Sequence, residues 1–328
     1  MTITAFVSIF WPFPFEGTRD LAEKAQAEFL ELGPLLRLNE TTPVSICKLS
    51  DEDAAPIRRE FLKEQVRPSV LTKFEYEVDD SPPDISGDIE DLAPLDFEQI
   101  KQAVIQSEFE FFLGQICLAC NIAKPGLIEF GAGTILFKGQ QTGYSDFPHY
   151  ITGLSELITS DNDWPKVQLI PFNQSWNWLS NIPDFWSGFS SSPIGRALGA
   201  FSHFIYKGSG GHHSLLEHLW AIVGIESLFQ SNGSQRDLLQ KAKVLIGDAP
   251  DSKKLLYSVY GHRSGVVHGG VDFPFSFCDA DATPEYESYE SKSLWLIDSS
   301  IPILLSSLQN LCLRDLHNLT FEYIIKEV

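Results

Sequence analysis

The apolar residues of this 328-residue chain change their periodicity once, and that change constrains the fold more than any other feature. Before about residue 150, segments with the two-residue period of strands alternate with segments of helical period. From residue 173 onward almost every segment has the helical period. We therefore expect an α+β protein in which a mixed α/β domain (residues 1–165) precedes an all-α helical bundle (residues 173–328). A chain of this length commonly divides its core between two domains.

The first half is expected to contain strands, helices and one long solvated loop. Two segments read as strands and three as helices: Ile3–Trp11 and Lys73–Val78, then Arg19–Leu32, Ile57–Glu64 and residues 97–122. Residues 79–98 carry eight acidic side chains and no basic one, with three prolines, which predicts the loop. Leu127–Phe130 and Thr134–Lys138 are expected to form a hairpin that turns at Gly131-Ala132-Gly133.

The second half is expected to contain six helices. They are Asn173–Asn181, Pro193–Tyr206, Ser214–Gln230, Ser234–Ile246, Ser252–His268 and one within Glu290–Leu319. Pro193 suits a first helical turn. Gly269-Gly270 is a strong stop, because glycine accepts the left-handed conformation that commonly ends a helix.

The net charge excludes a protein that coats nucleic acid without specificity. The chain has 24 basic and 44 acidic residues, a balance of −20, whereas phosphate neutralisation requires a basic surface. Residues 1–170 account for −15 (13 basic, 28 acidic) and residues 171–328 for −5 (11 basic, 16 acidic). Residues 196–270 carry 8 basic and 5 acidic side chains, or +3. This basic segment is the part of the chain most suited to meet an anionic ligand.

The chain carries the features of a cytoplasmic protein. Its apolar start lacks a basic flank and is interrupted by Pro12 and Pro14, which favours a buried strand over a signal peptide. By sequence no segment reaches the roughly 20 apolar residues of a membrane helix, and no membrane association is expected. Five thinly spread cysteines suit a reducing compartment. Cys117 and Cys120 lie in an apolar helical stretch, so we interpret them as core residues.

Two helices of the second half each carry one charge in the middle of an apolar stripe. The charge is Arg263 in Ser252–His268 and Glu226 in Ser214–Gln230. The stripes are Leu256, Val259, Tyr260, Val266 and Val267 in the first helix, and Leu215, Leu216, Leu219, Ile222 and Val223 in the second. Because an unpaired buried charge is costly, we expect Glu226 and Arg263 to meet. Such a pair can be purely structural and fix the register of the two helices.

His268 makes a functional interpretation attractive. It follows Arg263 by five residues, about 140° around the helix, on a face shared with Tyr257, Gly261 and Ser264. Arg263 and His268 can converge on one atom only in two ways. Either the glycine-rich last turn distorts, or a second copy of the helix is brought alongside by a two-fold axis.

The sequence from residue 256 to residue 269, Leu-Tyr-Ser-Val-Tyr-Gly-His-Arg-Ser-Gly-Val-Val-His-Gly, resembles the signature helix of HEPN domains, in particular the Apea-like branch. That branch reads as a Tyr, then Arg-Ser, a few mostly apolar residues and His-Gly. The resemblance covers about residues 173–320. It implies a dimeric helical bundle, and in many members a metal-independent endoribonuclease of toxin–antitoxin, anti-phage or RNA-decay systems. Ser264 departs from the stricter signature, which has Asn, Asp or His after the Arg.

Carried over by motif position, the resemblance makes Arg263 and His268 the catalytic pair. Glu226 would orient Arg263, and Ser264 would support the same site. Tyr257 and His262 are candidate substrate contacts, although for Tyr257 the favoured interpretation is a half-buried core residue. The implied partners are RNA and a further copy of the chain, as a homodimer or a higher homo-oligomer, with a regulatory partner at the first domain. No metal and no cofactor is expected. The alternative is a non-catalytic dimeric module for protein interaction or ligand sensing.

Two weaker patterns are interpreted structurally. His212-His213 with Glu217-His218 has metal-binding residue types, but a structural zinc site needs four ligands at suitable spacing. A polar helix start explains this run, in which His212 and His213 could contact phosphate. Four tryptophans near the start of the bundle could stack on bases, but core packing between the domains suits them better: Trp164, Trp176, Trp178 and Trp186.

Overall fold

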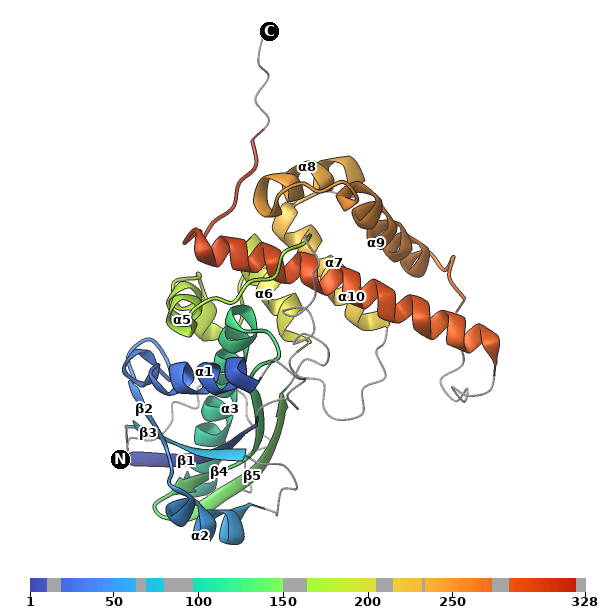
Figure 1. The fold of residues 1–328 in the computed structure, drawn as a ribbon. Helices are drawn as coiled ribbons and strands as arrows, with labels where there is room; N and C mark the ends of the chain where they lie inside the picture. Colours follow the sequence, from blue (N-terminus) through green and yellow to red (C-terminus); the bar gives the residue numbers. More distant parts are fainter. Residues whose placement is uncertain are drawn as a thin grey trace. The chain divides into compact units, whose positions relative to one another are not determined.

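The chain divides into two compact units in the computed structural model, which describes residues 1–10, 19–62, 69–79, 97–149, 164–204, 215–231, 234–272 and 283–322 (Figure 1). The first unit holds Met1–Ser155 and Pro171–Asn177, and the second holds Glu156–Ile170 and Trp178–Val328. The division falls within helix α5 (Phe172–Ser180). A sheet in the first unit and a helical second unit confirm the expected α+β class.

The first unit is built on a five-stranded antiparallel sheet. Its strands lie in the order β2-β3-β1-β4-β5. Their bounds are β1 (Thr2–Phe10), β2 (Val44–Lys48), β3 (Ser69–Glu77), β4 (Glu129–Phe137) and β5 (Gln140–His149). The expected strands at Ile3–Trp11 and Lys73–Val78 correspond to β1 and β3. The edge strands β2 and β5 were not predicted from the sequence.

Helices cover both faces of this sheet (Figure 1). The helices α1 (Arg19–Leu30) and α3 (Phe97–Ala123) pack on one face, and α2 (Asp51–Phe61) packs on the other. On the first face, Phe74 of β3 meets Phe109 of α3 with ring centroids 5.6 Å apart. On the second face, Phe6 of β1 and Leu71 of β3 enclose Ala54 of α2. Residues two apart along a strand share a face, so this alternation sets which side chains enter each core.

The expected hairpin turn at Gly131-Ala132-Gly133 is wrong. These residues lie inside the continuous strand β4, and the turn to β5 is made by Lys138 and Gly139, whose φ angles are 51° and 76°. Two successive positive φ angles are typical of the turns that fit the twist of a hairpin. A Cβ at Gly131 would overlap the ring of Phe10 on the neighbouring strand β1. Glycine is therefore needed there for close packing rather than for a turn.

The second unit is a helical bundle arranged around one long helix (Figure 1). Its helices are α6 (Pro193–Ser202), α7 (Leu215–Phe229), α8 (Gln235–Ile246), α9 (Ser252–Val267) and α10 (Pro284–Leu313). The long helix α10 contacts all four others, and residues 300–309 are buried throughout. All of these helices were expected from the sequence. The helix α10 begins earlier than predicted, because the Thr283 side chain accepts a hydrogen bond from the Tyr286 N–H and Pro284 occupies the first turn.

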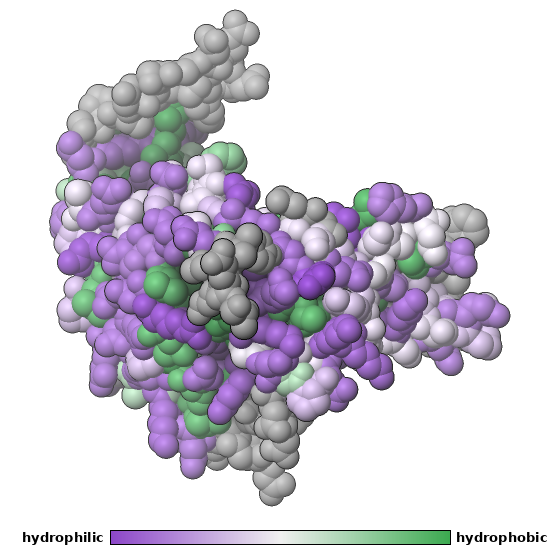
Figure 2. Space-filling model, turned by 90° about the horizontal axis from the view of Figure 1, so that it is seen from above, coloured by the Kyte–Doolittle hydropathy of each residue, from purple (hydrophilic) through white to green (hydrophobic). Residues whose placement is uncertain are grey.

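Among the described residues, two helices, α3 and α10, are long and apolar enough to cross a membrane by length and composition, whereas no such segment is expected from the sequence. In their most apolar windows, 56% and 78% of the residues are buried inside the protein. This is the pattern of core helices in a soluble protein. On the face drawn in Figure 2, hydrophobic residues lie in separate patches on a largely hydrophilic surface.

Candidate functional site

The buried face of α7 differs from the predicted stripe. Of the predicted stripe, Ile222 is buried, but Leu216 and Val223 are 50% and 44% exposed. The other buried residues of α7 are Glu217, His218, Ala221, Gly224, Ile225, Leu228 and Phe229. The side chain of Leu215 lies outside the described residues. Because α7 is apolar on most of its circumference, periodicity alone does not predict which face is buried. The close approach of α6 and α10 at Gly224 decides it, since a Cβ there would lie 2.7 Å from Leu304 Cδ2 on α10 and 3.3 Å from Ala200 Cβ on α6.

The predicted apolar stripe of α9 is buried in the first turns of the helix, as expected, but not in the last turn. Leu256, Val259 and Tyr260 are buried, but Val267 is 54% exposed. The helix therefore packs into the bundle through its first half, and its last turn lies at the surface. Arg263 and His268 belong to this outer part of the helix.

Glu226 and Arg263 meet, as expected. Arg263 Nη2 lies 3.3 Å from Glu226 Oε2, and the two side chains are 31% and 23% exposed. The pair is thus half-buried at the rim of the bundle rather than in its core. The hydroxyl of Tyr260 donates a 2.6 Å hydrogen bond to Glu226 Oε1. Burial, reinforced by this hydrogen bond, raises the pKa of Tyr260 to about 12.

The last turn of α9 ends in the expected glycine stop and leaves His268 exposed. His268 is the C-cap, and its backbone N–H donates to Ser264 O at 3.0 Å. Gly269 has a φ of 70°, and the N–H of Gly270 donates to Gly265 O at 2.7 Å. This is the hydrogen-bond pattern of a Schellman cap. The helix is continuous to Val267, so the distortion that would bring Arg263 and His268 together within one chain is not present.

The other predicted site residues occupy different surroundings. Tyr257 is half-buried, with Lys253 Nζ 5.6 Å from its ring centroid, and Ser264 is half-buried one position after Arg263. Gly261 is exposed, and an added Cβ would make only an ordinary contact, with Gln235 Nε2 at 3.9 Å. His212 and His213 lie outside the described residues.

His262 does not face outward as a substrate contact would. Its ring lies edge to face with that of His218 on α7, with centroids 5.7 Å apart. His218 is fully buried, and its Nδ1 lies 3.2 Å from Ser300 Oγ on α10. Burial and the neighbouring His262 lower the pKa of His218 to about 4. Burial also lowers the pKa of His262, with a smaller contribution from Lys292.

The metal-like run of residues 212–218 gives no indication of this His218–His262–Ser300 cluster, because His262 and Ser300 lie far from His218 in the sequence. The sequence feature that indicates a buried His218 is its spacing, since His218, Ile222 and Ile225 fall on one helical face. Among the described residues no group of three or more His, Cys, Asp or Glu side chains could hold a metal ion.

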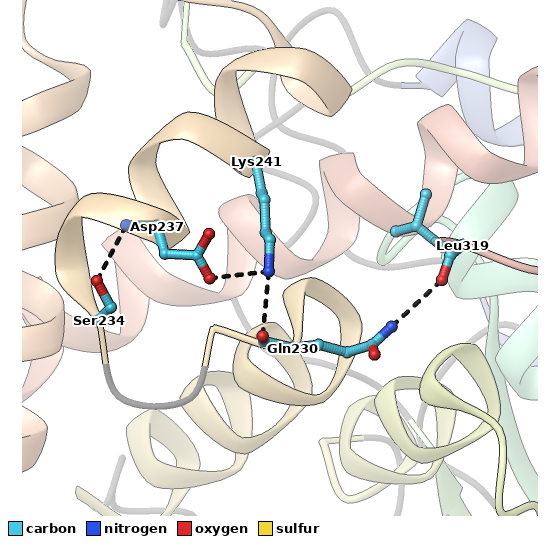
Figure 3. Close-up of polar contacts among 5 residues, drawn as sticks. All are labelled: Gln230, Ser234, Asp237, Lys241 and Leu319. Carbon is cyan, nitrogen blue, oxygen red and sulfur yellow. Dashed lines mark hydrogen bonds and ion pairs between the residues drawn. The ribbon is translucent and has the colours of Figure 1, made fainter. Parts of the chain in front are cut away.

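Much of the positive charge of residues 196–270 is paired. Lys241 Nζ lies 2.8 Å from Asp237 Oδ2 and donates to Gln230 O at 3.1 Å, at the end of α7 (Figure 3). Lys243 is paired with Asp248 at 2.8 Å, and Arg263 is paired with Glu226. Among the described residues of this segment, exposed cations remain at Arg196, Arg236, Lys253 and Lys254. The basic segment is therefore weaker as an anion-binding surface than its composition suggests.

The cysteines and two of the tryptophans serve the core. Cys117 and Cys120 are buried in α3, and burial raises the pKa of both thiols. Trp176 and Trp178 are buried, and their indole N–H groups donate to Leu35 O and Leu316 O. A base-stacking role for these two tryptophans is therefore wrong. Trp164 and Trp186 are partly exposed.

Comparison of the chain with protein-family models, curated proteins and solved structures finds no match. The case for any function therefore depends on the residues of α7 and α9 themselves.

Proposed function

We propose that this protein is a metal-independent endoribonuclease of HEPN type that acts on RNA as a homodimer or higher homo-oligomer, in the cytoplasm, as a toxin or anti-phage defence effector. The observation that carries the proposal is the outer half of α9. There the half-buried Arg263 guanidinium pairs with Glu226 of α7, whose other carboxylate oxygen accepts a hydrogen bond from Tyr260, and His268 stands exposed at the helix end. These positions match the Arg-Ser and His-Gly of the signature helix.

The residue types suit RNA cleavage. Histidine accepts and donates protons near neutral pH, and arginine offers a fixed set of donors to phosphate oxygens. His268 of one subunit would take the proton of the 2′-hydroxyl as its oxygen attacks phosphorus. His268 of the partner subunit would protonate the departing 5′-oxygen, leaving a 2′,3′-cyclic phosphate and a 5′-hydroxyl. Arg263 would stabilise the charge on the pentavalent phosphorane.

Exposed apolar side chains beside the site support a second copy. Val223 lies one turn before Glu226 on α7, and Val267 lies one turn after Arg263 on α9. They are 44% and 54% exposed in the single chain. A second copy that covered them would bring its own α9 to the site, which is the remaining way for Arg263 and His268 to converge.

In this proposal the first unit regulates the nuclease, by sensing a trigger or binding a regulatory partner. The −15 balance of residues 1–170 supports it, because a strongly acidic region repels RNA that does not approach through the site on α9.

The test is cleavage of a labelled single-stranded RNA by the full chain, with and without EDTA. Arg263→Ala and His268→Ala are expected to abolish cleavage while the oligomer is retained in size-exclusion chromatography. Arg59→Ala, which removes an exposed cation of α2, and His317→Ala are the matched controls. Cleavage that survives in His268→Ala, or that EDTA abolishes in the wild-type protein, contradicts the proposal.

The alternative is the non-catalytic dimeric interaction or ligand-sensing module. Two observations favour it: Arg263 is already paired with Glu226, and His268 faces solvent in the single chain. It predicts a stable oligomer that does not cleave RNA, and an Arg263→Ala variant that changes only thermal stability.

A further inference from the structure

One carboxylate, that of Glu226, is shared between two side chains of the neighbouring helix. Its Oε1 accepts the 2.6 Å hydrogen bond from the Tyr260 hydroxyl, and its Oε2 lies 3.3 Å from Arg263 Nη2. Tyr260 and Arg263 are three residues apart on α9 and so lie on the same side of that helix. Glu226 comes from α7, so the three groups also join the two helices.

The exposure of these three side chains increases from Tyr260 to Glu226 to Arg263. Tyr260 is 5% exposed, whereas the side chains of Glu226 and Arg263 are 23% and 31% exposed. A glutamate held only by a surface arginine would exchange rotamers, because long charged side chains keep much of their conformational freedom at a surface. A buried tyrosine has only two side-chain torsions and is fixed by packing. The rigid partner of Glu226 is therefore Tyr260.

We infer that Tyr260 is the positioning residue of the site: through Glu226 it fixes the direction in which Arg263 presents its guanidinium to a phosphate. This inference rests on the proposed ribonuclease function. The raised pKa of Tyr260, about 12, keeps its phenol protonated and donating to Glu226 throughout the neutral range.

The hydroxyl can be removed without the ring. In Tyr260→Phe the buried aromatic packing remains, and the carboxylate of Glu226 loses its anchor. With a short RNA substrate and the full chain, kcat is expected to fall by about tenfold or more, while KM stays within about twofold, because alignment of the guanidinium matters most in the transition state. Tyr286→Phe, the same change near the start of α10, is the control and should retain wild-type kinetics.

A double variant shows whether Tyr260 acts through Glu226. Glu226→Gln removes the charge that holds Arg263, so adding Tyr260→Phe to it should lower kcat by no more than about twofold. Equal losses from Tyr260→Phe in the wild-type and Glu226→Gln proteins would overturn the inference.

A readout that does not depend on activity separates this inference from the proposed function. The side-chain N–H signals of Arg263 in an NMR spectrum, assigned by comparison with Arg263→Lys, should be resolved in the wild-type protein and should collapse toward the free-arginine position in Tyr260→Phe. An unchanged signal together with unchanged kcat overturns the inference. A collapsed signal in a protein whose wild type cleaves no RNA keeps the positioning role and removes the ribonuclease.

Discussion

His218 and His262 lie edge to face between α7 and α9, with ring centroids 5.7 Å apart. His218 is fully buried and reaches Ser300 on α10, whereas His262 directly precedes Arg263. Side chains of α7, α9 and α10 therefore meet at a point where protonation of His218 is unfavourable. This arrangement ties the stability of the bundle to pH.

The bundle is expected to lose stability as the pH falls from about 6.5 to about 4. Folding lowers the pKa of His218 from 6.5 to about 4, so the unfolded chain binds a proton across this interval and the folded chain does not. The neutral imidazole therefore contributes fully to the free energy of unfolding above pH 6.5. As the pH falls toward 4, the free energy of unfolding decreases by about 1–3 kcal/mol. Urea unfolding followed across this range measures it.

The comparison that isolates His218 uses a matched pair of variants. His218→Gln should flatten the dependence of unfolding free energy on pH between 6.5 and 4, whatever its effect at neutral pH. His268→Gln makes the same change at an exposed position and should keep the wild-type slope. An unchanged slope in His218→Gln would assign the acid sensitivity to other groups.

Gly224 sets how closely α6, α7 and α10 approach. An added Cβ would lie 2.7 Å from Leu304 Cδ2 and 3.3 Å from Ala200 Cβ, so Gly224→Ala should destabilise the protein by about 1–3 kcal/mol through overpacking. Gly199→Ala in α6 is the control, because no atom lies within 4 Å of its added Cβ. That variant should be neutral or stabilised by up to about 1 kcal/mol, since alanine favours the helix. Equal thermal unfolding midpoints for the two variants would show that the helices can move apart at no cost.

The cap of α9 depends on the left-handed conformation of Gly269. Its φ of 70° is unfavourable for a residue with a Cβ, so Gly269→Ala should cost about 1 kcal/mol and loosen the last turn. If His268 acts on RNA, its cleavage rate should fall as well. Gly261 lies within the same helix, and an added Cβ there meets only Gln235 Nε2, at an ordinary contact distance of 3.9 Å, so Gly261→Ala should raise the thermal midpoint slightly. A wild-type midpoint for Gly269→Ala would contradict the role of this cap.

Sequence patterns predict the parts of the fold that depend on residues close together in the sequence or on simple charge pairing. The helical bundle, the stop at Gly269-Gly270 and the contact between Glu226 and Arg263 follow from spacing and from the cost of an unpaired buried charge. The failures involve distant residues. The sequence around Gly131 predicts a turn, because the residue that requires glycine there, Phe10, lies far away in the sequence.

The predicted buried face of α7 is correct for Ile222 and wrong for Leu216 and Val223, for a similar reason. Its position is set by Gly224 against Leu304, and an almost entirely apolar helix gives no local signal of that contact. The exposed Leu216 and Val223 are the consequence, and they bear on how the site is completed.

If a second copy completes the site, Val223 is where the interface is most easily broken. It is 44% exposed one turn before Glu226, and a carboxylate there would be buried unpaired on association. Val223→Glu should therefore shift the protein toward the single chain in size-exclusion chromatography with light scattering, and should reduce RNA cleavage in parallel. Val244→Glu makes the same change on α8 at a side chain that is 69% exposed, and it should alter neither property. A Val223→Glu protein that stays associated and fully active would place the interface on another face, whereas loss of association with undiminished cleavage would show that one chain contains the whole active site.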